Sequence, residues 1–501
     1  MGGLKMKKKL ISVLLSTTMI ATILGGCGGS SNNNSSSTPA DNTNTSTESN
    51  APAADSNAST GDNAATGDSA AAATDLSSDA GQVINIYSFN TEVRDRINAV
   101  YPEITEAGES QSKLKDGRVI NWIINPNQDG VYQDKLDEAL AGQMSAADDE
   151  KVDIFAAELA YITKYPDADI DAAMKLTDLG IDPNTDLADQ FDFTKTVASD
   201  QNGDMRATSW QACPGVLVYR RDIAKEVFGT DDPAEVGKKT SSWDELKKTA
   251  EELKAAGYYT LACYDDTFRL YSNSMAQPWV AATDTVVKVD KQIMDWVNDS
   301  MEWYQAGYFD PAVSGQWNSD WYTAMSPDSK VFSFLFPAWG IDTQLVPNWG
   351  DGPEGSWAVT NAPAAYNWGG TFVLAATGTD NPAYAKDILL CLTANADSLT
   401  KISQEYADFT NAKTVMQNAA TDAAFASDFL GGQNPYEYFT PGAANIKMAP
   451  LSSYDQGCVE LIQNSFHDYL KGQVDLDTAK ANFETAIKER YPEITEVQWP
   501  E

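Results

Sequence analysis

The chain contains a single histidine, His467, among its 501 residues. Apolar residues around it recur at helical spacing, and His467 falls on the polar side of this predicted helix with Glu460 and Lys471. We therefore interpret it as a solvated helix residue. A Ser-His-Asp triad and a metal site built from several histidines are both excluded, because each needs histidine in a working position.

Carboxylates are abundant, and they leave one catalytic class open. Glycoside hydrolysis needs only a pair of Asp or Glu side chains, and the chain has 72 acidic residues. Asp167, Asp169 and Asp171 have the alternate spacing of a calcium loop, but Ala172 and Asp178 stand where such a loop requires glycine and glutamate. A structural calcium therefore stays open, and we expect no metal or cofactor in the functional site.

Four cysteines follow residue 80: Cys213, Cys263, Cys391 and Cys458. They are at least 50 residues apart, so the chain has no CxxC metal or redox motif. Cys391 shares the apolar face of a predicted helix with Ile388 and Leu392, which indicates a core position. An even number outside the cytoplasm permits disulfides, but no pairing follows from the spacing.

The aromatic residues indicate a different kind of chemistry. Nine of the 13 tryptophans fall between positions 279 and 368. Trp210, Trp339 and Trp368 stand at strand ends or in loops, beside Gly, Pro or Cys-Pro. Aromatic rings stack on the flat C–H faces of sugars, while planar polar side chains bind the surrounding hydroxyls. These three tryptophans are therefore candidate ligand-binding residues.

Polar residues at the ends of predicted strands complete the candidate site. They are Asn90 and Glu92 after strand 83–90, Glu158 and Tyr161 at the end of 151–158, and Asp265 and Asp266 at the end of 258–266. Open α/β sheets bind ligands at the carboxyl ends of their strands. We therefore add all six to the three tryptophans as predicted ligand-binding residues.

The elements that must position these residues alternate between strand and helix. Further strands are predicted at 213–219, 330–340 and 371–378. Ser242 and Glu245 form a capping box at the start of one helix, and Asn381 caps another that has Pro382 in its first turn. The alternation predicts α/β lobes with sheets covered on both faces, and residues 81–501 are too many for one core.

The N-terminal residues predict export. Lysines at 5 and 7–9 precede the apolar body 10–24, which is shorter than the ~20 residues of a membrane-spanning helix, so residues 1–26 are typical of a signal peptide. Leu-Gly-Gly-Cys resembles a bacterial lipobox, which makes Cys27 the lipidated N-terminus. The alternatives are a plain signal peptide with a chance cysteine, and a start at Met6 rather than Met1. Residues 27–80 have the composition of a flexible tether.

The charge excludes some partners. The formal net charge is −37, and residues 81–501 carry −34 once the lysines before Cys27 and the acids of the tether are left out. So acidic a surface repels phosphate backbones and anionic lipid. We therefore expect no nucleic-acid partner, and contact with a membrane only through the anchor.

Several long stretches carry a family resemblance: VLVYRRDIAKEVFG, SWDELKKTAEELKAAG, KVFSFLFPAWG and NWGGTFVLAATGTDNPAYAKDILLCLT. With the lipobox and tether, they resemble family 1 extracellular solute-binding proteins, the carbohydrate receptors of ABC importers. The resemblance implies the type II periplasmic-binding-protein fold, with two α/β lobes, a ligand cleft between them and three crossing segments near Met205, Trp368 and Gly442. Lobe 1 would hold 81–205 and 369–441, and lobe 2 would hold 206–368 and 442–501.

The resemblance also implies a function and partners. The family traps sugar by hinge closure and stacks a sugar on the counterpart of Trp339. It places hydroxyl-binding groups at the strand ends where Glu158 with Tyr161, Asp265 with Asp266, and Asn90 with Glu92 stand. Its partners are two permease subunits and their ATPases, which must be other chains. We expect a monomeric, lipid-anchored oligosaccharide receptor on the extracellular face of the cell membrane, and not an enzyme. The alternatives are a cell-surface glycosidase and a receptor for another solute such as a peptide.

Overall fold

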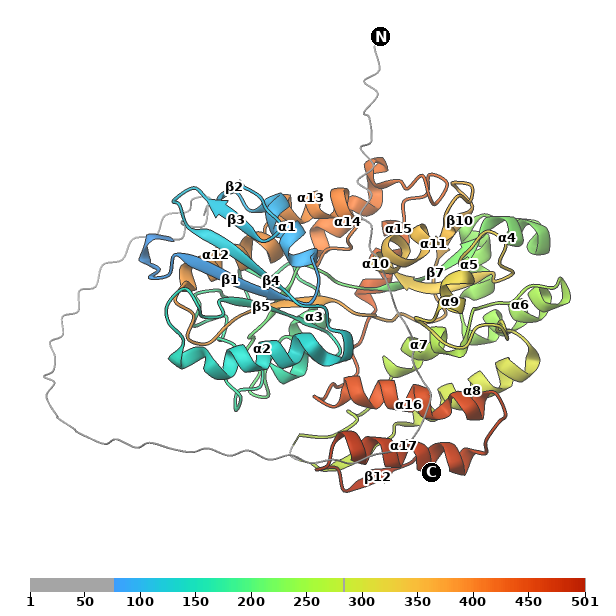
Figure 1. The fold of residues 1–501 in the computed structure, drawn as a ribbon. Helices are drawn as coiled ribbons and strands as arrows, with labels where there is room; N and C mark the ends of the chain where they lie inside the picture. The colour runs from blue at the N-terminus through green and yellow to red at the C-terminus, as the bar shows by residue number, and fades with distance from the viewer. Residues whose placement is uncertain (1–75, 283, 501) are drawn as a thin grey trace, which may run out of the picture. The chain divides into compact units, whose positions relative to one another are not determined.

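A mixed seven-stranded sheet forms the core of one part of the molecule (Figure 1). The computed structural model describes residues 76–282 and 284–500. The strand order is β2 (Ile104–Glu106), β3 (Gln111–Leu114), β4 (Val119–Ile124), β1 (Val83–Ser88), β5 (Ile154–Glu158), β11 (Thr371–Ala375) and β6 (Thr208–Ser209). β1 runs parallel to β4 and β5, whereas β11 is antiparallel to β5 and β6. We call this sheet and its helices lobe 1.

A second, antiparallel sheet forms the core of lobe 2. Its strands are β10 (Trp357–Thr360), β7 (Gly215–Arg220) and β9 (Ser333–Pro337) in that order. Every residue of the three strands is buried, because elements cover both faces of the sheet. A separate parallel pair joins β8 (Val286–Lys288) to β12 (Glu496–Gln498).

Helices surround both sheets (Figure 1). Those of lobe 1 are α1 (Glu92–Val100), α2 (Val131–Gly142), α3 (Asp192–Val197), α12 (Pro382–Thr393), α13 (Ala396–Tyr406) and α14 (Lys413–Thr421). Those of lobe 2 are α4 (Arg221–Phe228), α5 (Pro233–Thr240), α6 (Trp243–Ala255), α7 (Phe268–Ser272), α8 (Lys291–Ala306), α9 (Ser319–Thr323), α10 (Ala338–Gly340), α11 (Val346–Trp349), α16 (Asp455–Leu470) and α17 (Leu476–Arg490). α15 (Tyr436–Ala444) packs against both α14 and β7. α16 packs between α8 and α17.

Short turns of other helix types complete the element order. The 3₁₀ turns are η1 (Leu76–Ser78), η2 (Gln128–Gly130), η3 (Gln143–Ser145), η4 (Ile162–Lys164), η5 (Tyr264–Thr267) and η7 (Ala423–Phe425). A π-helical turn, η6 (Ile341–Leu345), joins α10 to α11. None of the helices in the described part of the chain has both the length and the apolarity that crossing a membrane requires.

Five of the six predicted strands are confirmed, as β1, β5, β7, β9 and β11. The predicted strand 258–266 is wrong, because this stretch makes only isolated bridges at Tyr259 and Leu261 and then enters η5. Asp266 causes the turn: its Oδ2 accepts hydrogen bonds from the backbone N–H groups of Ala262 and Cys263, both at 3.1 Å. The carboxylate thus satisfies donors that a sheet would otherwise pair.

The two predicted helix caps differ in outcome. Ser242 accepts a hydrogen bond from the Glu245 N–H at 3.2 Å and so caps α6, whereas the Glu245 carboxylate pairs with Lys248 at 2.6 Å, so only the Ser242 half of the predicted capping box forms. Asn381 makes no capping bond to α12, although Pro382 does occupy the first turn. Instead, Asp79 accepts hydrogen bonds from the first free N–H groups of α12, at 2.9 and 2.8 Å. The cap is supplied from a distant part of the sequence.

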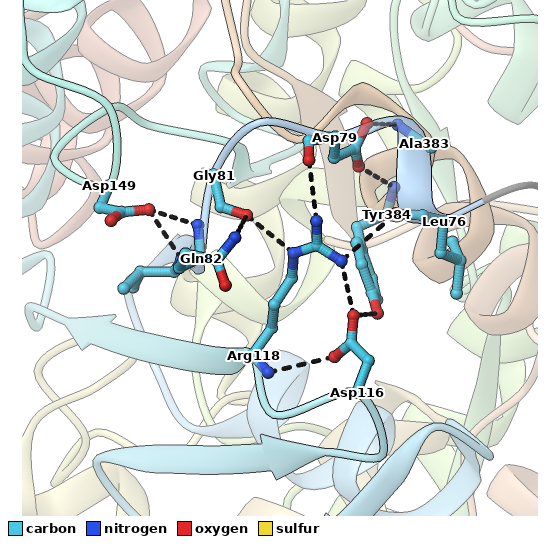
Figure 2. Close-up of polar contacts among 10 residues, drawn as sticks. Leu76, Asp79, Gly81, Gln82, Asp116, Arg118, Asp149, Ala383 and Tyr384 are labelled. Atoms are coloured by element: carbon cyan, nitrogen blue, oxygen red, sulfur yellow. Dashed lines mark hydrogen bonds and ion pairs between the residues drawn. The ribbon is translucent and has the colours of Figure 1, made fainter.

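Residues 76–81 are fastened to lobe 1 around Arg118 (Figure 2). The Arg118 guanidinium donates to the carbonyl oxygens of Gly81 and Asp79, both at 2.8 Å, and pairs with Asp116 at 2.5 Å. Residues 76–80, predicted to end the tether, therefore belong to the folded lobe. Cys27 and the rest of the predicted signal peptide and tether lie outside the described residues.

Three segments connect the lobes. β6 still pairs with the lobe 1 sheet, so the first segment spans 210–214, a few residues beyond the predicted position at Met205. The second lies between β10 and β11 and contains Trp368, and the third lies between α14 and α16 and contains Gly442. Pro214 and Asn367 form an antiparallel bridge, so the first two segments run side by side.

Candidate functional site

A cavity of about 450 Å³ lies where these connecting segments meet both lobes. Lobe 1 contributes residues 158–160 at the end of β5, and the second connecting segment contributes Asn367 and Gly369. Lobe 2 contributes η5 and α7, the loop 316–318, the loop 448–451 and one side of α16. The volume falls in the range of sites for small molecules.

Two of the predicted ligand-binding carboxylates line this cavity, Glu158 and Asp265. Glu158 is the last residue of β5; its carboxylate accepts the Ala160 N–H at 2.7 Å, and burial raises its pKa. Asp265 is 5% exposed and accepts from the Gln316 N–H at 3.1 Å and from the Gln463 amide at 3.4 Å. The two acids come from different lobes, as a site between lobes requires.

A cation, Arg269, lies in the same cavity. Burial lowers the pKa of its guanidinium even though Glu158 and Asp455 attract its charge. Among the described residues, Arg269 makes no side-chain hydrogen bond or ion pair. Burial raises the pKa of Asp455 to about 7, although Ser452 donates two hydrogen bonds to its carboxylate. Arg269 therefore presents free donors to whatever fills the cavity.

Trp317 lines the cavity with an exposed aromatic ring, and it is not among the predicted ligand-binding residues. Its side chain is 41% exposed, and its backbone φ of 67° lies in the left-handed region that tryptophan rarely adopts. The ring lies parallel to that of Trp339, with centroids 6.5 Å apart, and edge-on to that of Trp368, 5.9 Å away. No sequence pattern predicts this backbone conformation. The only indication of an aromatic site here was the cluster of nine tryptophans between positions 279 and 368.

Trp339 and Trp368 pack against Trp317 rather than forming the cavity wall themselves. The Trp339 indole N–H donates to the Trp368 carbonyl oxygen at 3.0 Å. Trp368 is only 7% exposed and stacks on Phe336, with centroids 6.3 Å apart. Two of the three predicted tryptophans, Trp339 and Trp368, therefore lie beside the cavity and pack against the ring of Trp317.

Three other predicted residues are buried and do not line the cavity. Trp210 is fully buried, and its indole N–H donates to Asp408 at 3.1 Å. Tyr161 is 4% exposed and packs edge-on against Phe89. Asp266, besides ending the strand at η5, accepts hydrogen bonds from Gln316 and Trp321, both at 2.9 Å. Contacts with neighbouring residues direct these side chains into the protein interior. The position of a residue at the end of a strand does not predict that direction.

Asn90 and Glu92 lie in a separate polar cluster of lobe 1 and do not line the cavity. Asn90 accepts the Glu92 N–H at 3.1 Å, as a local turn. Burial and the nearby Asp408 raise the pKa of Glu92. Asp408 is itself held by Arg96 through two hydrogen bonds, at 3.0 and 3.1 Å. These residues stabilise the start of α1 instead.

His467 lines the cavity, which corrects its interpretation as a solvated residue. Its Nε2 lies 3.4 Å from the Asp265 carboxylate, and its side chain is 24% exposed. Gln463 and Asn464 line the same wall. The sequence did place all three on the polar side of one helix, but a polar face that borders a cavity has the same pattern as one that borders solvent.

No metal site is formed in the described part of the chain. Asp171 pairs with Arg206 at 3.3 Å, and Asp167 accepts the Asp169 N–H at 2.9 Å, so the aspartates of the possible calcium loop bond within the protein. The four cysteines beyond residue 80 are all free thiols.

Solved structures of similar fold include three binding proteins. A crystal structure of an extracellular solute-binding protein of family 1 matches with a TM-score of 0.62 and 17% identity, over 82% of this chain and 100% of that chain. An ABC transporter associated binding protein from B. animalis subsp. lactis Bl-04, in complex with beta-1,6-galactobiose, matches at 0.59 and 16%, over 83% and 100%. The galacto-N-biose-/lacto-N-biose I-binding protein from Bifidobacterium longum, in complex with lacto-N-biose, matches at 0.59 and 15%, over 84% and 100%.

These matches show the fold of the chain: it is the two-lobed α/β fold of solute-binding proteins. No family model matches the sequence, and no curated protein matches it either. The predicted fold class is therefore confirmed by the arrangement of the lobes and by structural similarity, at sequence identities that carry no further inference.

Proposed function

We propose that this chain is an oligosaccharide receptor that delivers its ligand to an ABC importer. The observation that carries the proposal is the cavity between the lobes, where the exposed ring of Trp317 lies near carboxylate, amide and guanidinium groups. A sugar needs this combination of an apolar face and hydroxyl-binding groups at its rim. Two of the similar folds are described with bound disaccharides, which agrees with this ligand class.

The connecting segments support a hinge mechanism for binding. Gly369 and Gly370, next to the cavity, have φ values of 78° and 123°, which only glycine adopts without strain. Asn367 joins the first two segments, because its side chain accepts the Cys213 N–H at 3.2 Å and donates to the Gly369 carbonyl at 3.0 Å. Closure of the lobes around the sugar is the motion this connection would permit.

The remaining parts of the proposal come from the sequence. The lipobox would attach Cys27 to the outer face of the cell membrane, and the Ser- and Asn-rich tract would let the lobes move above it. Permease subunits and ATPases of the importer would be separate chains. The acidic surface is compatible with a receptor for neutral sugars.

A glycosidase remains the second candidate, because Glu158 and Asp455 both line the cavity with raised pKa values. Glycoside hydrolysis needs one carboxyl group that stays protonated as the general acid, and burial favours the neutral form of both. One experiment separates the two functions. The protein is screened against neutral oligosaccharides by thermal unfolding, and those that stabilise it are incubated with it and analysed by chromatography. A receptor is stabilised by ~2.7 kcal/mol at a hundredfold excess over Kd and returns the sugar intact. Cleaved sugar would show an enzyme, and the absence of any stabilising sugar would contradict the proposal.

A further inference from the structure

One face of α16 forms a continuous wall of the cavity. Residues spaced three or four apart share a helix face. Those of α16 that line the cavity include Gln456, Val459, Glu460, Gln463, Asn464 and His467. At 1.5 Å per residue, the wall from Gln456 to His467 is about 16 Å long, or roughly three helical turns.

The two ends of this wall differ. At one end, the Gln133 side chain on α2 of lobe 1 donates to the Gln456 side-chain oxygen at 3.1 Å. This bond links the two lobes at the Gln456 end of the wall. At the other end, His467 approaches Asp265 near Trp317, which is 41% exposed. Glu460 and Asn464 in the middle of the wall are exposed as well, so the cavity is open to solvent along α16 and at Trp317.

Resting on the proposed function, we infer that the ligand is a chain of at least three sugar rings that lies along α16. One helical turn rises ~5.4 Å, which is close to the length of one extended, linked pyranose unit, so three rings match the wall from Gln456 to His467. Most of the wall is polar, with amides at Gln456, Gln463 and Asn464 that both donate and accept hydrogen bonds, as ring hydroxyls require. Chains longer than three rings extend past Trp317 into solvent.

This arrangement sets a minimum number of sugar rings for tight binding and no maximum number. A monosaccharide or disaccharide leaves part of the polar wall in contact with water and forgoes its hydrogen bonds. A fourth or fifth ring lies outside the wall and adds little contact. Affinity should therefore rise up to three rings and then level off.

The test measures affinity by calorimetry across ladders of neutral oligosaccharides, from monosaccharide to hexasaccharide, prepared from starch, cellulose, xylan, mannan and galactan. In whichever ladder binds, the trisaccharide should bind at least about tenfold more tightly than the disaccharide, and the tetrasaccharide about as tightly as the trisaccharide. A disaccharide that binds within about twofold of the trisaccharide would overturn the inference while leaving the proposed function intact. If no ladder binds, the proposed function fails, and the inference fails with it.

Two variants locate the third ring. Gln456→Ala removes a cavity-lining amide, whereas Gln133→Ala breaks the same bond between the lobes from outside the cavity. The readout is the ratio of disaccharide Kd to trisaccharide Kd, which a general effect on lobe closure does not change. Gln456→Ala should lower this ratio by about threefold or more, and Gln133→Ala should leave it unchanged. An equal change in both variants, or no change in Gln456→Ala, would overturn the placement of the chain along α16.

Discussion

At the scale of single residues, the cavity combines one exposed ring with charged groups that are partly buried. Trp317 presents an apolar surface that costs little to cover, and Arg269 has donors without a partner among the described residues. Glu158 and Asp455 are carboxylates in positions that favour the neutral form. Such residues contribute little to folding and are suited to binding.

Replacing Trp317 with alanine should weaken sugar binding without unfolding the protein. The ring makes no hydrogen bond, but it packs against Trp321, Trp339 and Trp368, so apo stability should fall by ~1 kcal/mol, which does not unfold the protein. Binding should weaken by ~2 kcal/mol, roughly thirtyfold in Kd, as for other central aromatic anchors. Calorimetric titration and apo unfolding measure the two effects, with Trp317→Phe as the variant that keeps a ring. Unchanged affinity in Trp317→Ala would show that the ring does not contact the sugar.

Trp339→Ala should behave differently, because this indole donates a hydrogen bond to Trp368 and packs against two rings. We expect it to lower both the affinity for sugar and the unfolding free energy, the latter by ~1–3 kcal/mol. The same two measurements apply. A variant that loses affinity at unchanged apo stability would indicate direct stacking on the sugar instead of support for Trp317.

The raised pKa of Asp455, about 7, predicts a pH-dependent stability. A carboxyl group whose pKa is higher in the folded state stabilises the fold below its unfolded value of ~3.9, and this contribution is lost as the pH rises through 7. Asp455→Asn stays neutral, so it should match the wild type at pH 4 and exceed its unfolding free energy by ~1–2 kcal/mol at pH 8. Urea unfolding at both values tests this, with Asp468→Asn on the exposed side of α16 as control. A difference that is the same at both pH values would contradict the burial of this carboxyl group.

At the scale of elements, the order of strands and helices could be predicted from the sequence, while the direction of individual side chains could not. The alternating pattern of 83–90 located β1, strands were also predicted correctly at β5 and β11, and the strand-end rule located Glu158. The prediction failed at 258–266, because Asp266 bonds back to the backbone and ends the strand early. It also missed Trp317, since a loop conformation with positive φ depends on tertiary contacts.

The contacts of Arg118 provide a test of how the first residues of lobe 1 are held (Figure 2). Arg118→Gln should remove the bonds to Gly81 and Asp79 and leave carbonyl oxygens without donors, which costs ~2–3 kcal/mol of unfolding free energy. Lys115→Gln is the matched control, because its pair with Glu103 is largely exposed and contributes less than ~1 kcal/mol. Chemical unfolding of both variants gives the comparison. Equal losses would show that the Arg118 contacts do not fasten this segment.

At the scale of the whole molecule, two lobes share one cavity. Glu158 comes from lobe 1, and Asp265, Trp317 and α16 come from lobe 2, so neither lobe forms the site alone. The hydrogen bond between Gln133 and Gln456 also links the lobes. A ligand that contacts both lobes shifts the equilibrium between the open and closed forms toward the closed form. The size of the shift is set by how much more tightly the ligand binds the closed form than the open form.

Small-angle X-ray scattering tests directly whether sugar binding closes the two lobes. The protein is measured with and without the oligosaccharide that stabilises it most in the thermal screen. If sugar binds between the lobes and closes them, the radius of gyration should decrease at saturating ligand, and Trp317→Ala should need a correspondingly higher concentration for the same decrease. A radius of gyration that stays constant while calorimetry shows full occupancy would contradict closure of the lobes around the ligand.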